Sequence, residues 1–480
     1  MLSETMKTFR LITALFAVMT TMVLGTSALQ AASDSHHEDA ESAEHHGDKA
    51  DHDGAGHHGP EADGEHEHGE ASEYGPAGKP TFLKKLGYSY LTAYMFFLSI
   101  CLGSLFLILI NHLFDAQWIL PMRRYLEHIA CLLFPTMGIL FIPVLLLAPT
   151  IYPWFSIDPH TDHALHAKWP LFTKPAFYIC SIGLFFVWGF LTRRLRYWSL
   201  QQDVAEVENG GYEGKMMFPE SLFAAISTGL LGHNVEERPA VRCSRMMNIH
   251  ASYGIVVFAV TLTLAAIFWV KALQHEFFST MYGVYYFAGS VWVALATCYL
   301  LTLWLKQNGP LQHVVRPVTF HDTGKLFFAF TVFYSYIHFS QYFLIWNAAI
   351  PEETFWYVKR EQGSWWWVGQ LMIFGHFFLP FLALLRIDAK MNLNIMIPMC
   401  VWAWLIHYFD MQFNIMPVLY PDGVHISIFD PLSMGFIGLV LWMFFNNSFA
   451  SHPPYPQRDP RIAEAMGLYV EPEGGEPATN

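Results

Sequence analysis

The chain has 480 residues, of which 53% are hydrophobic and only 14% are charged. This composition is too apolar for an ordinary soluble protein, and the length is too great for one small domain, so the sequence indicates a polytopic membrane protein. The formal net charge is -13, but much of the acidic excess lies between Ser33 and Glu73. No basic stripe points to nucleic-acid binding, and we expect no nucleic-acid partner.

Residues 1–32 have the features of a secretory signal peptide or an uncleaved signal anchor. Lys7 and Arg10 precede an apolar run from Leu11 to Leu24, and small residues follow it. Either form places residue 33 and the chain after it outside the cytoplasm.

Residues 33–80 are rich in His, Asp and Glu and contain almost nothing apolar. Such a segment buries too little surface to offset the entropy of ordering, so we expect a disordered periplasmic tail. Its nine histidines suit loose binding of divalent metal, and a simple solvated tail is the other interpretation.

Residues 81–450 form the predicted transmembrane domain, an all-α region with about nine membrane-spanning helices. Each apolar run reaches the roughly 20 residues that a helix needs to cross the hydrocarbon core. The runs are 87–111, 126–149, 172–193, 249–271, 282–305, 325–347, 365–385, 392–411 and 431–449.

The charges flanking these runs predict the orientation. Sixteen Lys and Arg residues fall on the side predicted to be cytoplasmic, against five in the outer loops after the first helix. This bias predicts a bacterial inner-membrane protein whose C-terminal tail, residues 451–480, is cytoplasmic. The long inner loop, 197–244, contains a short apolar stretch from Phe218 that we expect to form a surface-lying helix.

The cysteine pattern gives no basis for a redox cofactor in this chain. The sequence has six cysteines but no CxxC or CxxCH motif. Iron-sulfur ligation and covalent haem attachment therefore lack their usual ligands, and we expect no redox cofactor of the chain's own.

Ionisable residues inside apolar helices are costly and usually face a protein interior, a water-filled cavity or a partner. Here they occur at several depths; for example, His338 lies 13 residues after Lys325, which is about 20 Å of helix. From the inner to the outer surface, the predicted proton path is Glu127, His128, His250, Tyr334, His338, His376, His407, Asp410, Glu352 and Glu353.

Other interpretations of these residues stay open. They also suit buried polar groups that stabilise helix packing through hydrogen bonds. His338 and His376 lie at matching depth, as a bis-histidine haem b site requires. The aromatic residues near 346 and 364–370 suit an outer aromatic belt, and also a quinone site.

Three stretches resemble the F subunit (ActF) of bacterial alternative complex III. The most specific is "KLFFAFTVFYSYIHFSQYFLIWNAAIPEETFWYVKR" (325–360), with "HEFFSTMYGVYYFAGS" (275–290) and "WILPMRRYLE" (118–127) in matching order. In the first stretch the family's motif residues correspond to Phe339, Ser340, Gln341, Tyr342, Ile345, Trp346, Pro351, Glu352, Glu353, Trp356, Tyr357 and Arg360.

The resemblance implies a fold like that of NrfD-like membrane subunits, a pair of four-helix bundles. It also implies a scaffolding subunit of a quinol-oxidising respiratory complex, and this subunit is a candidate proton conductor. The expected partners are a multihaem cytochrome c, an iron-sulfur protein, an NrfD-like C subunit, the lipid bilayer and the quinol pool. Haem c and iron-sulfur clusters are expected on those subunits, with a quinone nearby.

Two alternatives come from different classes of protein. One is an NrfD-like subunit that itself binds quinone, using His407 and Asp410. The other is a metal transporter whose His-rich tail captures metal.

Overall fold

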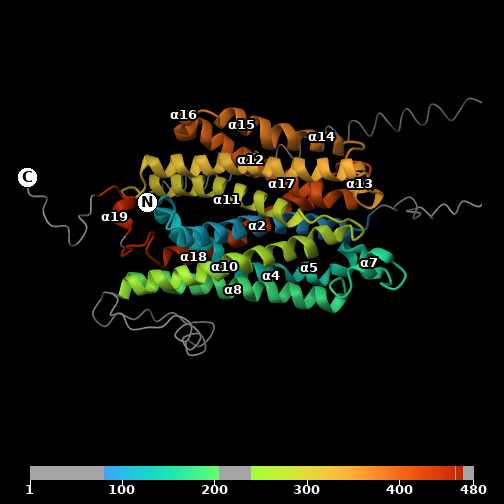
Figure 1. Ribbon diagram of the computed structural model, residues 1–480, viewed down its shortest axis with the longest axis horizontal. Coiled ribbons are helices and arrows are strands. Elements are labelled where there is room, and N and C mark those ends of the chain that lie inside the picture. The colour runs from blue at the N-terminus through green and yellow to red at the C-terminus, as the bar shows by residue number, and fades with distance from the viewer. Residues whose placement is uncertain (1–79, 205–238, 460, 469–480) are drawn as a thin grey trace, which may run out of the picture.

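The computed structural model describes residues 80–204, 239–459 and 461–468 (Figure 1). Within these residues every regular element is a helix, as the sequence predicts. The predicted signal, the His-rich tail up to residue 79 and the surface helix expected after Phe218 lie outside the described residues.

Helices occur at all nine predicted positions in the described part of the chain. Seven positions hold a long continuous helix, namely α2 (Phe82–Leu113), α8 (Lys174–Val204), α10 (Pro239–Trp269), α11 (Tyr282–Gln307), α12 (Pro317–Ala348), α17 (Leu393–Ile415) and α18 (Phe429–Ala450). The other two hold broken helices, namely η1 (Gln117–Met122), α3 (Arg123–Cys131), η2 (Leu133–Met137), α4 (Gly138–Leu140), α5 (Ile142–Leu146) and α6 (Ala148–Ile151), and then α14 (Trp365–Leu371), η5 (Met372–Phe378) and α15 (Leu379–Leu384).

Seven of these nine helical segments, within the described residues, are long and apolar enough to cross a membrane. The two that do not reach this apolar content are α12 and α17, which are also long. Both contain residues of the predicted proton path, such as His338 in α12 and Asp410 in α17. These polar residues are among those that lower the hydropathy of the two helices.

Prolines explain why two segments are broken. Phe134, directly before Pro135, is extended at φ -145° and ψ 130°, as expected because the ring of a proline disfavours helical backbone in the residue before it. In the other segment, Pro380 follows the π-helical turn η5. A proline has no N–H to donate to the preceding turn, which favours such local rearrangement.

The Pro-Glu-Glu segment, predicted as an outer loop, is a short helix. α12 ends at Ala349, whose φ of 51° is left-handed. Pro351 then starts α13 (Pro351–Val358), with Glu352 and Glu353 in its first turn. Proline is favoured at the first position of a helix, and acidic side chains are favoured in the first turn.

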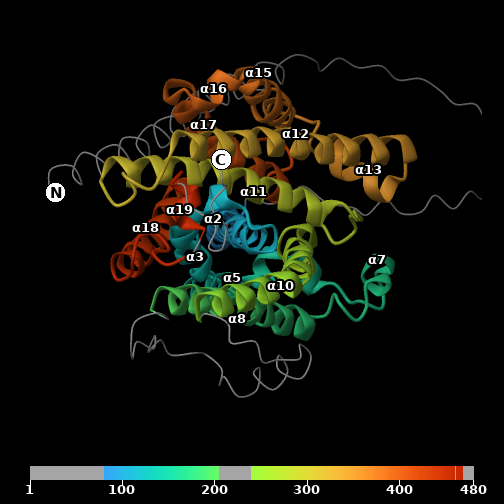
Figure 2. The ribbon, with the colours of Figure 1, turned by 60° about the vertical axis from the view of Figure 1, so that its left-hand side comes forward.

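The long helices run side by side along the longest axis of the molecule (Figure 1). Figure 2 shows α2 near the centre, with α10, α11 and α18 around it. α8 packs on α10, while α12 packs on the other face of α11. Helices α14, α15 and α16 (Ile387–Met391) form an outer layer beyond α12. The predicted pair of four-helix bundles stays a prediction.

Short elements join these helices in the described residues. They are η3 (Pro153–Ser156), α7 (His163–Ala167), η4 (Lys271–Leu273), η6 (Met416–Val418) and α19 (Ile462–Ala465). α19 lies against η1, so the segment after α18 folds back onto the end of the bundle where α3 begins.

Candidate functional site

Five of the ten predicted proton-path residues lie together inside the bundle. We call them, with three neighbours, the central cluster. Its members are Ser99 (α2), Tyr285 (α11), Tyr334 and His338 (α12), His376 (η5), and His407, Asp410 and Asn414 (α17). The cluster forms because α11 packs against both α12 and α17, and α17 also packs against α2 and η5.

One carboxylate oxygen of Asp410 accepts hydrogen bonds from two residues. The Tyr285 hydroxyl donates to Oδ1, and Asn414 Nδ2 donates to the same oxygen at 3.1 Å. The Tyr285 oxygen in turn accepts from the Tyr334 hydroxyl at 3.0 Å and from Asn414 Nδ2 at 2.9 Å. The two tyrosines and Asp410 therefore form one directed chain of hydrogen bonds.

The other carboxylate oxygen faces an imidazole nitrogen. The Ser99 hydroxyl donates to the Phe96 carbonyl at 2.6 Å, so its oxygen accepts at 2.8 Å from His407 Nε2, which must hold the ring hydrogen. His407 Nδ1 is then a lone-pair acceptor, and it lies 3.7 Å from Asp410 Oδ2.

Neither Nδ1 nor Oδ2 has another hydrogen-bond partner among the described residues. The side chains of His407 and Asp410 are 0% and 1% exposed. Two acceptors that face each other out of contact with water are both stabilised by one proton placed between them. The pair is therefore a place where the fold can hold a single exchangeable proton.

His376 lies between two aromatic rings. Its ring centroid is 3.8 Å from that of Trp292 and 3.6 Å from that of Tyr334, so these rings cover opposite faces. The imidazole is fully buried, and neither nitrogen has a hydrogen-bond partner in the described residues. His338 contacts the same group through Tyr285 and Tyr334, with centroids 5.5 and 5.9 Å away.

A buried arginine closes one end of the central cluster. Arg360 is 1% exposed and donates to the carbonyls of Phe413 and Asn414 at 2.8 and 3.0 Å. Its guanidinium also lies 3.5 Å over the ring of Trp356. These contacts fix the end of α17, and therefore the position of Asn414 beside Asp410.

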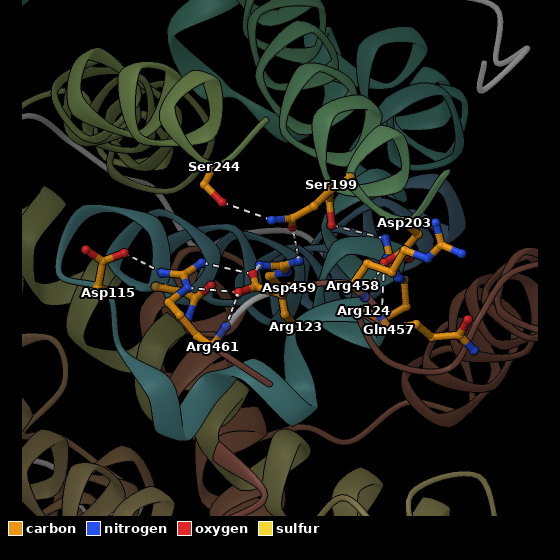
Figure 3. A network of polar contacts seen from close by, with 12 residues as sticks. Asp115, Arg123, Arg124, Ser199, Asp203, Ser244, Gln457, Arg458, Asp459 and Arg461 are labelled. Carbon is orange, nitrogen blue, oxygen red and sulfur yellow. Dashed lines mark hydrogen bonds and ion pairs between the residues drawn. The ribbon is translucent and has the colours of Figure 1, made fainter. Parts of the chain in front are cut away.

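Glu127 belongs to a second group of charged residues, at the end of the bundle near α19. We call this the terminal cluster, formed by Asp115, Arg123, Arg124, Glu127, Ser199, Gln202, Asp203, Asp459 and Arg461 (Figure 3). Arg124 donates to Glu127 at 2.9 Å, and Arg123 donates to Asp459 at 2.6 Å. Each carboxylate oxygen of Glu127 thus lies within ion-pair distance of an arginine, and a buried carboxylate requires such pairing.

Figure 3 shows Asp459 between the guanidinium groups of Arg123 and Arg461. Burial alone would raise the pKa of Asp459, but these two cations hold the pKa well below its usual range. The network ties the segment after α18 to α3, and through Asp203 also to α8.

The remaining predicted residues lie apart from both clusters. His128 Nδ1 is 2.9 Å from Ser448 Oγ on α18, and His250 Nδ1 donates at 2.6 Å to the Met246 carbonyl one turn earlier on α10. Glu352 is exposed and Glu353 is half-buried on α13. The structure therefore does not bring the ten residues into one continuous path.

The two clusters lie at different depths. Tyr285 precedes Cys298 by 13 residues on α11, which is about 20 Å of helix. The Cys298 carbonyl accepts a hydrogen bond from Tyr125, two residues before Glu127. The central cluster reaches the level of Trp292, because His376 stacks on that ring. Cys298 follows Trp292 by six residues, about 9 Å of helix, and the α11 residues between them are mostly buried and apolar and separate the clusters.

Sequence reasoning missed Ser99, Tyr285 and Asn414. Asn414 has a usable signal, since it lies one turn after Asp410 on the same helix face. Tyr285 lies in a stretch that carries the family resemblance, but no role was assigned to it. Ser99 is one of many serines in apolar helices and has no sequence signal of its own.

In the described residues no group of three or more His, Cys, Asp or Glu side chains is arranged to hold a metal ion. The histidines of the predicted metal-capture tail lie outside the described residues. A scan against models of known protein families finds no match for this chain, and a search of curated proteins finds no similar sequence.

Proposed function

We propose that this chain is a multi-pass membrane protein that carries protons through part of the bilayer. The observation that supports this most strongly is the pair formed by His407 and Asp410, whose unpartnered acceptor atoms face each other 3.7 Å apart in a fully buried place. Side chains that only stabilised helix packing would pair these two acceptors with donors, whereas His407 Nδ1 and Asp410 Oδ2 have none among the described residues. A transferable proton needs such a place to rest.

The hydrogen-bond chain beside this pair gives the proton a route. Tyr334 donates to Tyr285, and Tyr285 donates to Asp410. When each hydroxyl passes its hydrogen along the chain, Asp410 gains a proton and Tyr334 takes up another from its other side. His338 and His376 stack on the ring of Tyr334, and in this proposal they supply that proton.

The partner complex in this proposal is a quinol-oxidising respiratory complex like alternative complex III, in the bacterial inner membrane. The likeness of its sequence motifs to the F subunit supports this assignment. In this proposal the chain is a scaffold without a redox cofactor of its own, and partner subunits carry haem c and iron-sulfur clusters. The tail before residue 80 is then periplasmic and the C-terminus cytoplasmic.

The test of proton transfer is Asp410→Asn in the native complex, reconstituted into liposomes. Asparagine keeps the size of the side chain but cannot take up a proton, so we expect fewer protons moved per quinol oxidised while the complex stays assembled. Asp388→Asn is the matched control, because Asp388 is 80% exposed and pairs with the exposed Arg386. Unchanged proton stoichiometry in Asp410→Asn would contradict the proposal.

The partners are tested by purifying the tagged chain in mild detergent. We expect co-purified multihaem and iron-sulfur subunits in mass spectra, together with haem c bands in a reduced-minus-oxidised spectrum. A single colourless polypeptide from preparations that retain other native complexes would reject the respiratory-complex assignment. The proton-transfer proposal would then be tested on the isolated chain in liposomes.

A further inference from the structure

Two arginines of α8, Arg193 and Arg196, lie outside both clusters, and we call the place between them the basic notch. Arg196 Nη2, from α8, donates to Ser448 Oγ on α18 at 3.2 Å, and lies 3.4 Å from Nε2 of His452. Arg193, one turn earlier on α8, lies 5.2 Å over the ring of Phe134. Neither arginine has a carboxylate within ion-pair distance among the described residues.

The imidazoles in the notch do not supply the missing negative charge. His452 Nδ1 donates to the Ser448 carbonyl at 2.9 Å, and Arg196 Nη2 lies 3.3 Å from Nδ1 and 3.4 Å from Nε2 of the same ring. Burial, followed by the charge of Arg196, lowers the pKa of His452, in keeping with a neutral ring. His128 lies behind it at a centroid distance of 5.3 Å, and its buried Nε2 has no hydrogen-bond partner in the described residues.

An exposed apolar strip leads away from this notch. Phe134 contacts Phe186 of α8 with centroids 5.2 Å apart, so the contacts run from Arg193 through Phe134 to Phe186. The exposed side chains of the strip are Ile139 (61%), Ile142 (47%), Ile182 (48%) and Phe186 (46%). The strip is thus apolar and leads to two cations for which the described part of the chain supplies no carboxylate.

The position of the cations along α8 fits a membrane surface. Arg193 and Arg196 follow Lys174 by 19 and 22 residues, which is about 30 Å of helix and close to the thickness of a hydrocarbon core. If Lys174 lies at one headgroup level, the two arginines lie at the other. Basic notches between helices at this level suit anionic lipid headgroups.

We propose that this notch binds an anionic phospholipid, with its phosphate between Arg193 and Arg196 and its acyl chains along the apolar strip. The planar guanidinium groups suit bidentate hydrogen bonding to phosphate oxygens. The lipid's negative charge offsets two cations that have no carboxylate partner among the described residues, and its chains cover Phe186 and Ile139. The inference rests on placement in a bilayer but not on proton transfer or on any partner subunit.

The experiment titrates the full-length protein, purified in a mild detergent, with phosphatidylglycerol and with phosphatidylcholine of the same acyl chains. Native mass spectrometry counts the bound lipids. We expect one phosphatidylglycerol bound at saturation. Phosphatidylcholine should bind more weakly by roughly tenfold or more, because one hydrogen bond to a charged group changes affinity by roughly tenfold to a hundredfold. Inorganic phosphate should compete only weakly, because it cannot cover the strip.

Variants locate the site. Arg193→Gln and Arg196→Gln should each weaken phosphatidylglycerol binding by roughly tenfold. Arg386→Gln is the matched control, because Arg386 is 82% exposed and already paired with Asp388. If Arg196→Gln fails to fold after losing its bond to α18, Arg193→Gln still decides the question. Equal binding of the two lipids, unchanged binding in Arg193→Gln, or tight binding of inorganic phosphate alone would each overturn the proposal.

Discussion

At the scale of single residues, the buried His407 and Asp410 differ from the charged groups of the terminal cluster. Glu127 forms ion pairs with Arg123 and Arg124, so its negative charge is balanced by neighbours of opposite sign. Asp410 has only neutral hydroxyl, amide and imidazole neighbours among its described polar contacts. Its charge is therefore free to change, whereas removal of either arginine would leave Glu127 an uncompensated ion.

Tyr285→Phe tests the hydrogen-bond chain. The change removes one donor to Asp410 and the acceptor for Tyr334, but keeps the ring. We expect proton transfer to slow by roughly tenfold or more, the scale of one lost hydrogen bond to a charged group.

Proton uptake by the reconstituted protein, followed with a pH-sensitive dye, measures this effect. Tyr336→Phe is the matched control, because Tyr336 is 64% exposed on α12. Equal rates in the two variants would show that the hydroxyl of Tyr285 carries no proton.

The sequence reveals which polar residues lie deep in helices, because depth follows from counting residues along a helix. That argument places His338 and His376 at matching depth, and His407 with Asp410 further toward the outer surface. The structure instead brings all four into one cluster. It cannot tell which helix face a residue occupies or which helices are neighbours. For this reason His250, whose hydrogen bond stays within α10, could not be separated from the others.

At the scale of helices, hydropathy predicts where the nine segments lie but not where each one ends. α12 begins at Pro317, eight residues before the predicted start, because polar residues such as Asp322 continue a helix outside the apolar region. Hydropathy also does not detect the breaks at Pro135 and in η5. These depend on backbone hydrogen bonding, which an apolar run does not record.

Gly103→Ala tests the crossing of α2 with α11. A Cβ at Gly103 would overlap the Ser290 carbonyl oxygen and the Ala294 side chain, so the two helices would have to move apart. We expect a loss of stability of about 1 to 3 kcal/mol, typical of overpacking.

Thermal unfolding in detergent measures this loss. The matched change is Gly183→Ala on α8, where a Cβ meets nothing within 4 Å and helix propensity favours alanine by up to about 1 kcal/mol. A Gly103→Ala protein as stable as wild type would mean that the two helices are not in this close contact.

At the scale of the whole molecule, the segment after α18 ties the end of the bundle together. Asp459 bonds to Arg123 on α3, while the backbone of Gln457 donates to Asp203 on α8 at 3.0 Å. Gln117 Nε2 donates to Glu464 on α19 at 2.7 Å. Sequence reasoning predicts only a cytoplasmic C-terminal tail here, because the order of this segment depends on partners hundreds of residues earlier in the chain.

Asp459→Asn should destabilise the protein by about 3 kcal/mol near pH 7, because it leaves Arg123 and Arg461 short of a negative charge. The pKa of Asp459 is lower in the folded state than the value of about 3.9 expected when unfolded. Its stabilising effect is therefore complete above about pH 5, and is lost as the pH falls from 4 toward the folded-state pKa.

Melting temperatures at pH 7, 5, 4 and 3 test this dependence. We expect the difference between wild type and Asp459→Asn to be constant from pH 7 to 5 and to narrow below pH 4. A difference that persists undiminished at the lowest pH would assign the effect to packing instead of charge.

The apolar zone of about 9 Å between the level of Trp292, which stacks on His376, and the level of Cys298 also has an electrical consequence. In a membrane under voltage, the potential falls mainly across regions that lack water and mobile charge. Each proton that crosses such a region gains or loses about 2.3 kcal/mol per 100 mV. A proton that crosses the membrane along this bundle would therefore do most of its electrical work in this zone, whereas movement within either cluster would change its energy in the field only slightly.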